Sequence, residues 1–221
     1  TVPHLDRILN DRRGQRLEVV VHDPDLTLRD RNRPAIVAGA HLSNWELSAL
    51  ALGRLGIVNS ALYTPLTNPW LDRLLLESRA ALNCELLHRD NCARLLVERL
   101  NAGRSVGMLV DRPVGAGKPI PFFGREKITT CMPAKLALKF NCDLIPTRVE
   151  RIKGAHFRVT FHPPVRPANP GDYKNNQALD MMRQLHQLFE SWIRERPEDW
   201  FCSTRVWPKA RPENLEKTRR E

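Results

Sequence analysis

The sequence predicts an α/β fold in which a mixed, mostly parallel sheet is flanked by helices. Short apolar runs alternate with segments of helical periodicity along most of the 221 residues. One run, residues 35–40, is apolar enough to be buried on both faces, as in the middle of a parallel sheet. The length suits one large domain with a sizeable core. We therefore expect a single domain over residues 1–208 and a basic tail at 209–221.

The individual elements follow from the same patterns. Residues 17–21 are expected to form an edge strand, and further strands are expected at 58–63, 105–110 and 144–152. Helices are expected at 44–55, 69–82, 91–100, 132–140 and 175–196. A Lys153-Gly154 turn leads into a strand at 156–161. This turn predicts an antiparallel hairpin, which makes the sheet mixed.

The composition restricts the class of partner. The formal net charge is +10, from 35 Lys and Arg against 25 Asp and Glu, which favours nucleic acid, an anionic membrane surface, or acidic substrates and carrier proteins. Residues 112–153 carry nine basic and three acidic side chains and so hold much of this excess. Aromatic residues are only 6%, and no helix-turn-helix, zinc-finger or RNP pattern occurs. These observations argue against a nucleic-acid-binding module.

Cysteine usage and hydropathy bear on the compartment. The five cysteines are scattered without a C-x-x-C, which predicts reduced thiols rather than disulfides or a zinc cluster. No apolar run approaches the ~18 residues of a membrane-spanning helix, and residues 1–16 are too charged for a signal peptide. The chain as given is expected to be soluble. Because it begins with Thr1 rather than Met, we expect a fragment that lacks an N-terminal membrane anchor.

The segment Gly39-Ala40-His41-Leu42-Ser43-Asn44-Trp45-Glu46 is the candidate site. His41 would lie at the carboxyl end of a central strand, where open α/β sheets bind ligands. Glu46, in the first turn of the next helix, could reach back to the imidazole and hold one tautomer, leaving the other nitrogen to accept a proton from a substrate hydroxyl. A purely structural alternative remains open, in which Ser43 and Glu46 form a capping box.

Other chemistries find less support. Ser43 lacks a G-x-S-x-G frame, and no H-E-x-x-H zinc motif occurs. The run Gly115-Ala116-Gly117-Lys118 is similar to a phosphate loop, but Arg112 and Pro119 occupy positions that require glycine and a hydroxyl. Two roles are open for Lys118: it binds near a phosphorylated substrate, or it is part of a solvated surface loop. Phe122 and Phe123 line an acyl groove or pack in the core.

The motif around His41, together with the order of further motifs along the chain, resembles the lysophospholipid acyltransferase family. Within this family, the likeness is to the lipid A biosynthesis acyltransferases (lauroyl and myristoyl transferases). His41 and Glu46 meet the H-x4-[DE] signature. The likeness covers residues 17–209. It rests further on Asn68-Pro69, Leu71-Asp72, Arg79, Gly107-Met108-Leu109-Val110-Asp111, Pro121-Phe122-Phe123-Gly124, Pro133-Ala134, Ile145-Pro146, Trp200 and Arg205-Val206-Trp207-Pro208-Lys209. One departure is Asp111-Arg112, where the family usually has Asp-Gln.

The resemblance implies a glycerol-3-phosphate-acyltransferase-like fold and an O-acyltransferase activity that needs no cofactor and no metal. It assigns His41 as the general base, oriented by Glu46, that deprotonates an acceptor hydroxyl. This hydroxyl then attacks the thioester of an acyl carrier protein. The implied acceptor is a lipid A precursor in lipopolysaccharide biosynthesis.

The resemblance also implies substrate-binding residues and partners. Arg79 is expected to meet a phosphate and Asp111 to order the site. Asn44 and Lys118 are assigned to substrate binding with them. The expected partners are acyl carrier protein (or acyl-CoA), a phosphorylated glycolipid and the anionic surface of the bacterial inner membrane, at its cytoplasmic face.

Three alternatives stay open beside this interpretation. The acceptor could be another glycolipid, such as a phosphatidylinositol mannoside, or a lysophospholipid acylated from acyl-CoA. The chain could instead be a catalytically inactive lipid-binding protein, whose lipid binding would survive the loss of His41. A basic nucleic-acid-binding module is the third and the least supported.

Overall fold

The computed structural model describes residues 8, 16–22, 28, 30, 33–90 and 92–208. The expected basic tail at 209–221 lies outside these residues, as does most of 1–16. The strands are β1 (Leu17–Val21), β2 (Ile36–Gly39), β3 (Asn59–Tyr63), β4 (Glu85–His88), β5 (Ser105–Leu109), β6 (Lys118–Phe122), β7 (Arg125–Thr129), β8 (Leu144–Lys153) and β9 (His156–Phe161). The helices are α2 (Leu47–Arg54), α3 (Pro69–Arg79), α4 (Cys92–Asn101), α5 (Met132–Phe140) and α6 (Lys174–Glu195), with 3-10 helices η3 (Ala80–Leu82) and η4 (Pro197–Asp199).

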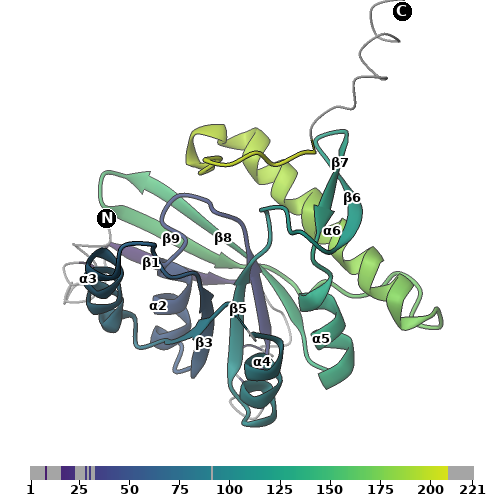
Figure 1. The fold of residues 1–221 in the computed structure, drawn as a ribbon, viewed down its shortest axis with the longest axis horizontal. Coiled ribbons are helices and arrows are strands. Elements are labelled where there is room, and N and C mark those ends of the chain that lie inside the picture. Colours follow the sequence, from purple (N-terminus) through teal and green to yellow (C-terminus); the bar gives the residue numbers. More distant parts are fainter. Residues whose placement is uncertain are drawn as a thin grey trace, which may run out of the picture.

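Within the described residues, seven strands form one sheet in the order β1-β9-β8-β2-β5-β3-β4 (Figure 1). Strands β8, β2, β5, β3 and β4 are mutually parallel. Strand β9 runs antiparallel to β8 and parallel to β1, which lies at the edge. The expected hairpin and the mixed, mostly parallel sheet are therefore confirmed. The chain reverses between β8 and β9 through Gly154, whose φ of 55° lies in the left-handed region.

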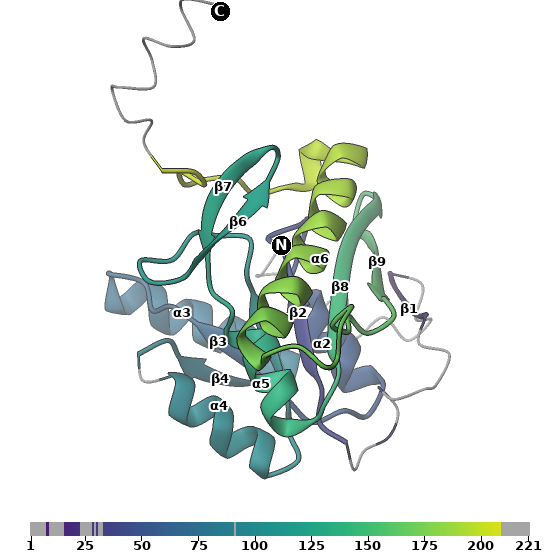
Figure 2. The same cartoon turned by 90° about the vertical axis from the view of Figure 1, so that its right-hand side faces the viewer.

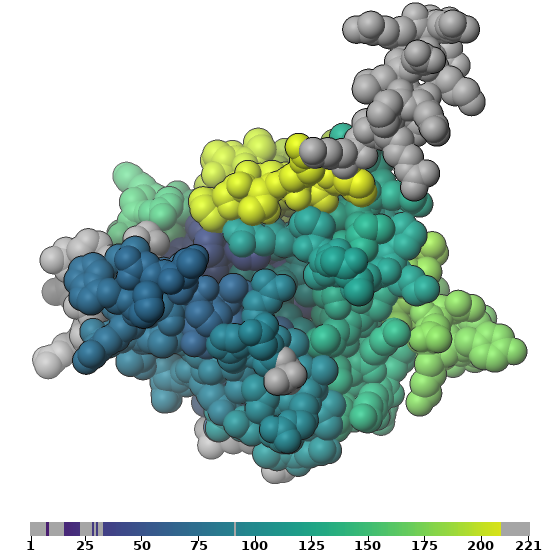
Figure 3. Space-filling model, in the orientation of Figure 1, coloured from purple at the N-terminus to yellow at the C-terminus, as the bar shows by residue number. Residues whose placement is uncertain are grey.

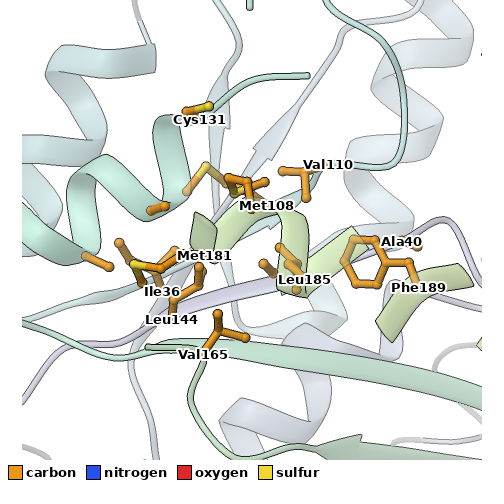
Figure 4. Close-up of a cluster of buried hydrophobic side chains, with 14 of the residues drawn as sticks. Ile36, Ala40, Met108, Val110, Cys131, Leu144, Val165, Met181, Leu185 and Phe189 are labelled. Carbon is orange, nitrogen blue, oxygen red and sulfur yellow. The ribbon is translucent and has the colours of Figure 1, made fainter. Parts of the chain in front are cut away.

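Helices cover both faces of the sheet. Helix α2 packs on one face, where Leu47, Leu50 and Leu52 meet inward side chains of β2, β8 and β9. Helices α4, α5 and α6 cover the other face, and the long α6 crosses the strands (Figure 2). Figure 4 shows this second core, in which Ile36 and Met108 of the sheet meet Met181, Leu185 and Phe189 of α6. The apolar stripe predicted on the last helix is thus largely its buried face.

Two elements escaped the sequence patterns. The β6–β7 hairpin was not expected because β6 contains Pro119 and Pro121, and proline is depleted in strands. Both prolines are tolerated because this ribbon has two strands only, and both side chains face solvent. Strand β4 is a short edge strand whose sequence, Glu-Leu-Leu-His, lacks β-branched residues.

The β6–β7 turn carries the Phe-Phe pair. Phe123 and Gly124 both have positive φ, 53° and 71°, as in the two-residue turns that match strand twist. The N–H of Phe123 donates to Glu190 Oε1 (2.7 Å), and its ring stacks on Trp200. Phe122 is completely buried among core residues, and its carbonyl accepts from Trp207 Nε1 (2.9 Å). Of the two predicted roles for this pair, the structure shows core packing.

In the described part of the chain, no helix combines the length and the apolar character needed to cross a bilayer.

Candidate functional site

The site is built where two parallel strands end side by side. Gly39 of β2 pairs with Leu109 of β5, so the residues that follow each strand leave the same edge of the sheet. Two residues beyond these positions are His41 and Asp111. The Nδ1 atom of His41 lies 2.6 Å from Oδ1 of Asp111. The Asp111 side chain is only 2% exposed and that of His41 12% exposed.

This contact selects the tautomer of the neutral imidazole. An ionised carboxylate can only accept, so Nδ1 of His41 carries a hydrogen, and in the neutral imidazole the lone pair is then on Nε2. Burial disfavours a charged Asp111, but hydrogen bonds from His41 and from Trp200 Nε1 (3.0 Å to Oδ2) hold the pKa of this carboxyl below its usual range. Asp111 is therefore anionic. Among the described residues, Nε2 of His41 has no hydrogen-bond partner, so it is available as a base.

A segment from the end of the chain closes over the motif. Ser43 N donates to Asp199 O (2.6 Å), and Phe201 N donates to His41 O (2.8 Å). Between them, Trp200 forms a bridge with Leu42 and bonds Asp111. In Figure 3 this yellow segment crosses above a hollow in the surface that is flanked by the dark blue residues of α3. Residues 199–201 thus complete a site that begins at His41, far earlier in the sequence.

The expected contact between Glu46 and His41 is wrong. Arg79 Nε and Nη2 donate to Glu46 Oε1 (3.0 and 2.6 Å), while Oε2 is buried without a hydrogen-bond partner in the described residues. Glu46 precedes α2 and turns toward α3 because residues 44–46 form tight turns ahead of the helix. The carboxylate that orients His41 is Asp111, from the neighbouring strand end.

The helix start and the capping box also differ from expectation. Helix α2 begins at Leu47 rather than at Asn44, and its N-cap makes no side-chain hydrogen bond. Ser43 has a φ of 51°, and its buried hydroxyl has no partner among the described residues. The Ser43–Glu46 capping box is therefore wrong, because the carboxylate it requires is bound to Arg79.

Three of the predicted substrate-binding residues, Arg79, Asn44 and Lys118, lie in different surroundings. Arg79 is mostly buried and directs two of its N–H groups to Glu46, so the paired donors expected to grip a phosphate are already engaged. Asn44, three residues after His41 in the sequence, is buried, and its Nδ2 has no hydrogen-bond partner in the described residues. Lys118 is exposed at the start of β6 and lies outside the hydrogen bonds that join His41, Asp111 and Trp200. Their roles toward substrate stay predictions.

Sequence reasoning missed the partnership of Asp111 with His41. Its signal was present: an acidic residue follows an apolar strand, and parallel neighbouring strands end at the same edge. It also missed Trp45, whose ring packs on the His41 ring with centroids 4.9 Å apart, and Lys127, which donates to the carbonyl of Asp111 (2.7 Å). A single sequence gives no signal for either contact.

An apolar pocket of about 110 Å³ opens on the α2 side of the sheet, between residues that flank His41 and Asp111 in the sequence. Its wall includes Gly39, Trp45 and Glu46, which flank His41 in the sequence. The complete lining is Val37, Gly39, Trp45, Glu46, Ser48, Ala49, Leu52, Asn59, Ala61, Leu62, Tyr63, Arg79, Leu82, Cys84, Leu86, Gly107, Met108, Leu109 and Thr147. Most of these side chains are apolar, so the pocket suits a hydrocarbon chain.

Comparison with known proteins adds to this geometry. The family model described as "Bacterial lipid A biosynthesis acyltransferase" matches residues 10–209. The chain is 24% identical over 205 residues to the phosphatidylinositol mannoside acyltransferase of Mycolicibacterium smegmatis (strain ATCC 700084 / mc(2)155), covering 89% of this chain and 64% of that protein. It is 24% identical over 178 residues to the protein of the same name in Mycobacterium tuberculosis (strain CDC 1551 / Oshkosh), covering 78% and 54%. The chain thus spans less than two thirds of either relative.

A solved structure is also similar to the chain. It is the 1-acyl-sn-glycerophosphate (LPA) acyltransferase PlsC from Thermotoga maritima, with a TM-score of 0.48 and 15% sequence identity. The match covers 86% of this chain and 76% of that chain.

The Arg79–Glu46 pair yields a stability prediction. Arg79→Met leaves the Glu46 carboxylate buried without its counter-charge, and we expect the free energy of unfolding to fall by about 3 kcal/mol, measured by urea denaturation. The double variant Glu46→Gln/Arg79→Met removes both charges and should recover most of this loss. The control is Arg73→Met, which breaks an exposed pair with Glu77 on the same helix and should cost under about 1 kcal/mol. If Arg79→Met and Arg73→Met lowered the free energy of unfolding equally, the result would contradict a stabilising buried pair between Arg79 and Glu46.

Proposed function

Because the chain belongs to the bacterial lipid A biosynthesis acyltransferase family, we propose that it is an O-acyltransferase that moves a fatty acyl chain from a thioester to a hydroxyl of a phosphorylated glycolipid. The observation that carries this proposal is the pairing of His41 with a buried carboxylate beside an apolar pocket. The pair supplies a base, and the pocket suits an acyl chain. A thioester is already activated, so the remaining tasks are to position two reactants and to move one proton.

In the proposed reaction, Nε2 of His41 takes the proton of the acceptor hydroxyl as the hydroxyl oxygen attacks the thioester carbonyl carbon. Asp111 stabilises the imidazolium that forms and keeps the ring in the required tautomer. The tetrahedral intermediate then collapses, the carbon–sulfur bond breaks, and the leaving thiolate recovers the proton from His41. The Asn44 amide, an unpaired donor in the same motif, is a suitable group to bind the substrate.

We also propose identities for the acyl donor and the acceptor. We infer that the donor is acyl carrier protein, since an acidic carrier suits a chain with a net charge of +10, with acyl-CoA as the alternative. The family description supports a lipid A precursor as the proposed acceptor. We propose that the transfer takes place at the cytoplasmic face of the inner membrane. Two relatives are named phosphatidylinositol mannoside acyltransferase, which favours that glycolipid as the second candidate. An assay of each acceptor with each donor, read by mass spectrometry, distinguishes these combinations.

His41→Ala tests the base. We expect acyl transfer to fall by about 10²–10⁴-fold with the fold intact, because the acceptor hydroxyl loses its proton acceptor. Asp111→Asn should lower kcat strongly as well, since asparagine cannot stabilise the imidazolium. Circular dichroism and the melting temperature serve as fold controls. Near-normal turnover by folded His41→Ala protein would overturn the mechanism.

The pocket yields a prediction about acyl-chain length. Gly107 of β5 lies in the pocket wall, two residues deeper than Leu109 at the strand end. Gly107→Leu should fill part of the pocket and lower kcat/KM for long-chain donors at least about tenfold relative to short ones, since each unburied methylene loses about 0.8 kcal/mol. Gly107→Ala is the matched control, because its Cβ would make only ordinary contacts, 3.8 Å from the Ala61 Cβ. An unchanged chain-length preference in Gly107→Leu would exclude this pocket as the acyl site.

We further propose that α3 meets the membrane surface. Trp70, Leu71 and Leu74 are exposed along one side of the helix. Arg79, at the end of the same helix, lines the pocket. An amphipathic helix that exposes tryptophan and leucine is suited to the boundary between headgroups and acyl chains. A lipid acceptor could pass from such a surface to His41 without crossing bulk water.

Trp70→Ser/Leu74→Ser tests this contact. We expect at least about fivefold weaker binding to vesicles containing anionic phospholipid, measured by sedimentation, because two apolar side chains no longer enter the interface. The control is Val58→Ser, which removes another exposed apolar side chain (57% exposed, against 70% for Trp70) ahead of β3. Equal effects from both variants would argue against a role for α3.

A further inference from the structure

Lys127 is a charged residue in the hydrophobic interior. It lies on β7, in the hairpin that packs on α6, and its side chain has 0% exposure. Lysine is almost never fully buried unless its ammonium is paired, because removing the charge from water is costly. The position therefore requires an explanation in terms of the groups around the ammonium.

The ammonium binds the end of the strand that carries Asp111. Nζ donates to the carbonyl of Asp111 (2.7 Å) and to that of Val110 (3.3 Å), and it lies 4.6 Å from the centre of the Phe122 ring. Asp111 is therefore fixed at three points, through Oδ1 by His41, through Oδ2 by Trp200 and through its carbonyl by Lys127. Two of these contacts hold the side chain, and the third holds the main chain.

Among the described residues, two ionisable groups face the ammonium. Asp111, at the end of β5, attracts its charge. His186, on α6, is completely buried, and both burial and the Lys127 charge lower its pKa to about 4, so it is neutral near pH 7. The Asp111 carboxylate, in turn, contacts His41. The charges of Lys127 and Asp111 thus balance within the interior, next to the imidazole.

We infer that Lys127 is a positioning residue for the proton transfer by His41. It anchors the main chain that carries Asp111, and its positive charge opposes a second positive charge on the imidazole. This inference rests on the proposed function for its catalytic meaning, but the contacts that carry it are independent of the substrate. Without the ammonium, the imidazole would hold its proton to higher pH, and less of the base would be present at a given pH.

The experiment compares Lys127→Met with the unmodified protein by NMR titration of the His41 ring, assigned by its loss in His41→Gln. We expect the titration midpoint in Lys127→Met to move up by about one pH unit. The acid limb of kcat against pH should move with it, so that kcat at a pH well below both midpoints is about tenfold lower, with KM little changed. Lys127→Arg keeps the charge and should leave the midpoint near that of the unmodified protein. Lys139→Met, which removes an exposed lysine of α5, is the matched control.

A folded Lys127→Met protein whose His41 midpoint is unchanged or lower would overturn the inference. If this variant does not fold, the titration of the unmodified protein still tests the coupling between Lys127 and His41. Burial lowers the pKa of Lys127 to about 8, so the His41 resonance should show a second, smaller step near that pH. A single step up to pH 10 would then refute the coupling. Absence of acyl transfer by the unmodified protein would count against the proposed function alone, because the titration needs no substrate.

Discussion

The hydrogen bond between His41 and Asp111 is the interaction on which the arrangement of the site depends. A buried carboxylate is costly unless its oxygens are paired, and here the partners come from distant parts of the chain. The parallel register of β2 and β5 brings the two residues to one edge of the sheet. The segment after α6 supplies Trp200, and β7 supplies Lys127. The elements added to the central sheet therefore converge on a single residue, Asp111.

The two faces of the sheet serve this site differently. On the α5 and α6 side, large side chains fill the space, and Phe122 of the β6–β7 hairpin packs in the same core as Leu185 and Phe189 of α6. On the α2 side, Gly39, Ala61 and Gly107 line a pocket, because small residues on neighbouring strands leave room above the sheet. One face thus fixes Asp111, while the other provides space beside His41. Rigid support and an open pocket come from the same strands because successive side chains point to opposite faces.

Local patterns predicted most of the sheet, the antiparallel β8–β9 pair, helix α5 and the position of His41 at a strand end. They failed where contacts between residues far apart in the sequence determine the structure. Glu46 was expected at His41 because the two are close in sequence, but its carboxylate meets a cation from α3, and Asp111 takes its place from the adjacent strand. The β6–β7 ribbon was missed because the prolines of β6 disfavour a strand, and its aromatic contacts with Trp200 and Trp207 join residues about 80 positions apart.

The separation of the two carboxylates has an electrostatic consequence for the proposed reaction. Each one is matched by its own cation, Glu46 by Arg79 and Asp111 by the nearby Lys127. With His41 neutral, these charges sum to zero, so the site presents no excess negative charge to an anionic acceptor. When His41 takes the acceptor's proton, the site gains one positive charge while the tetrahedral intermediate gains one negative charge. A site in which both carboxylates faced the imidazole without these cations would hold the proton more tightly and would return it to the leaving thiolate less readily.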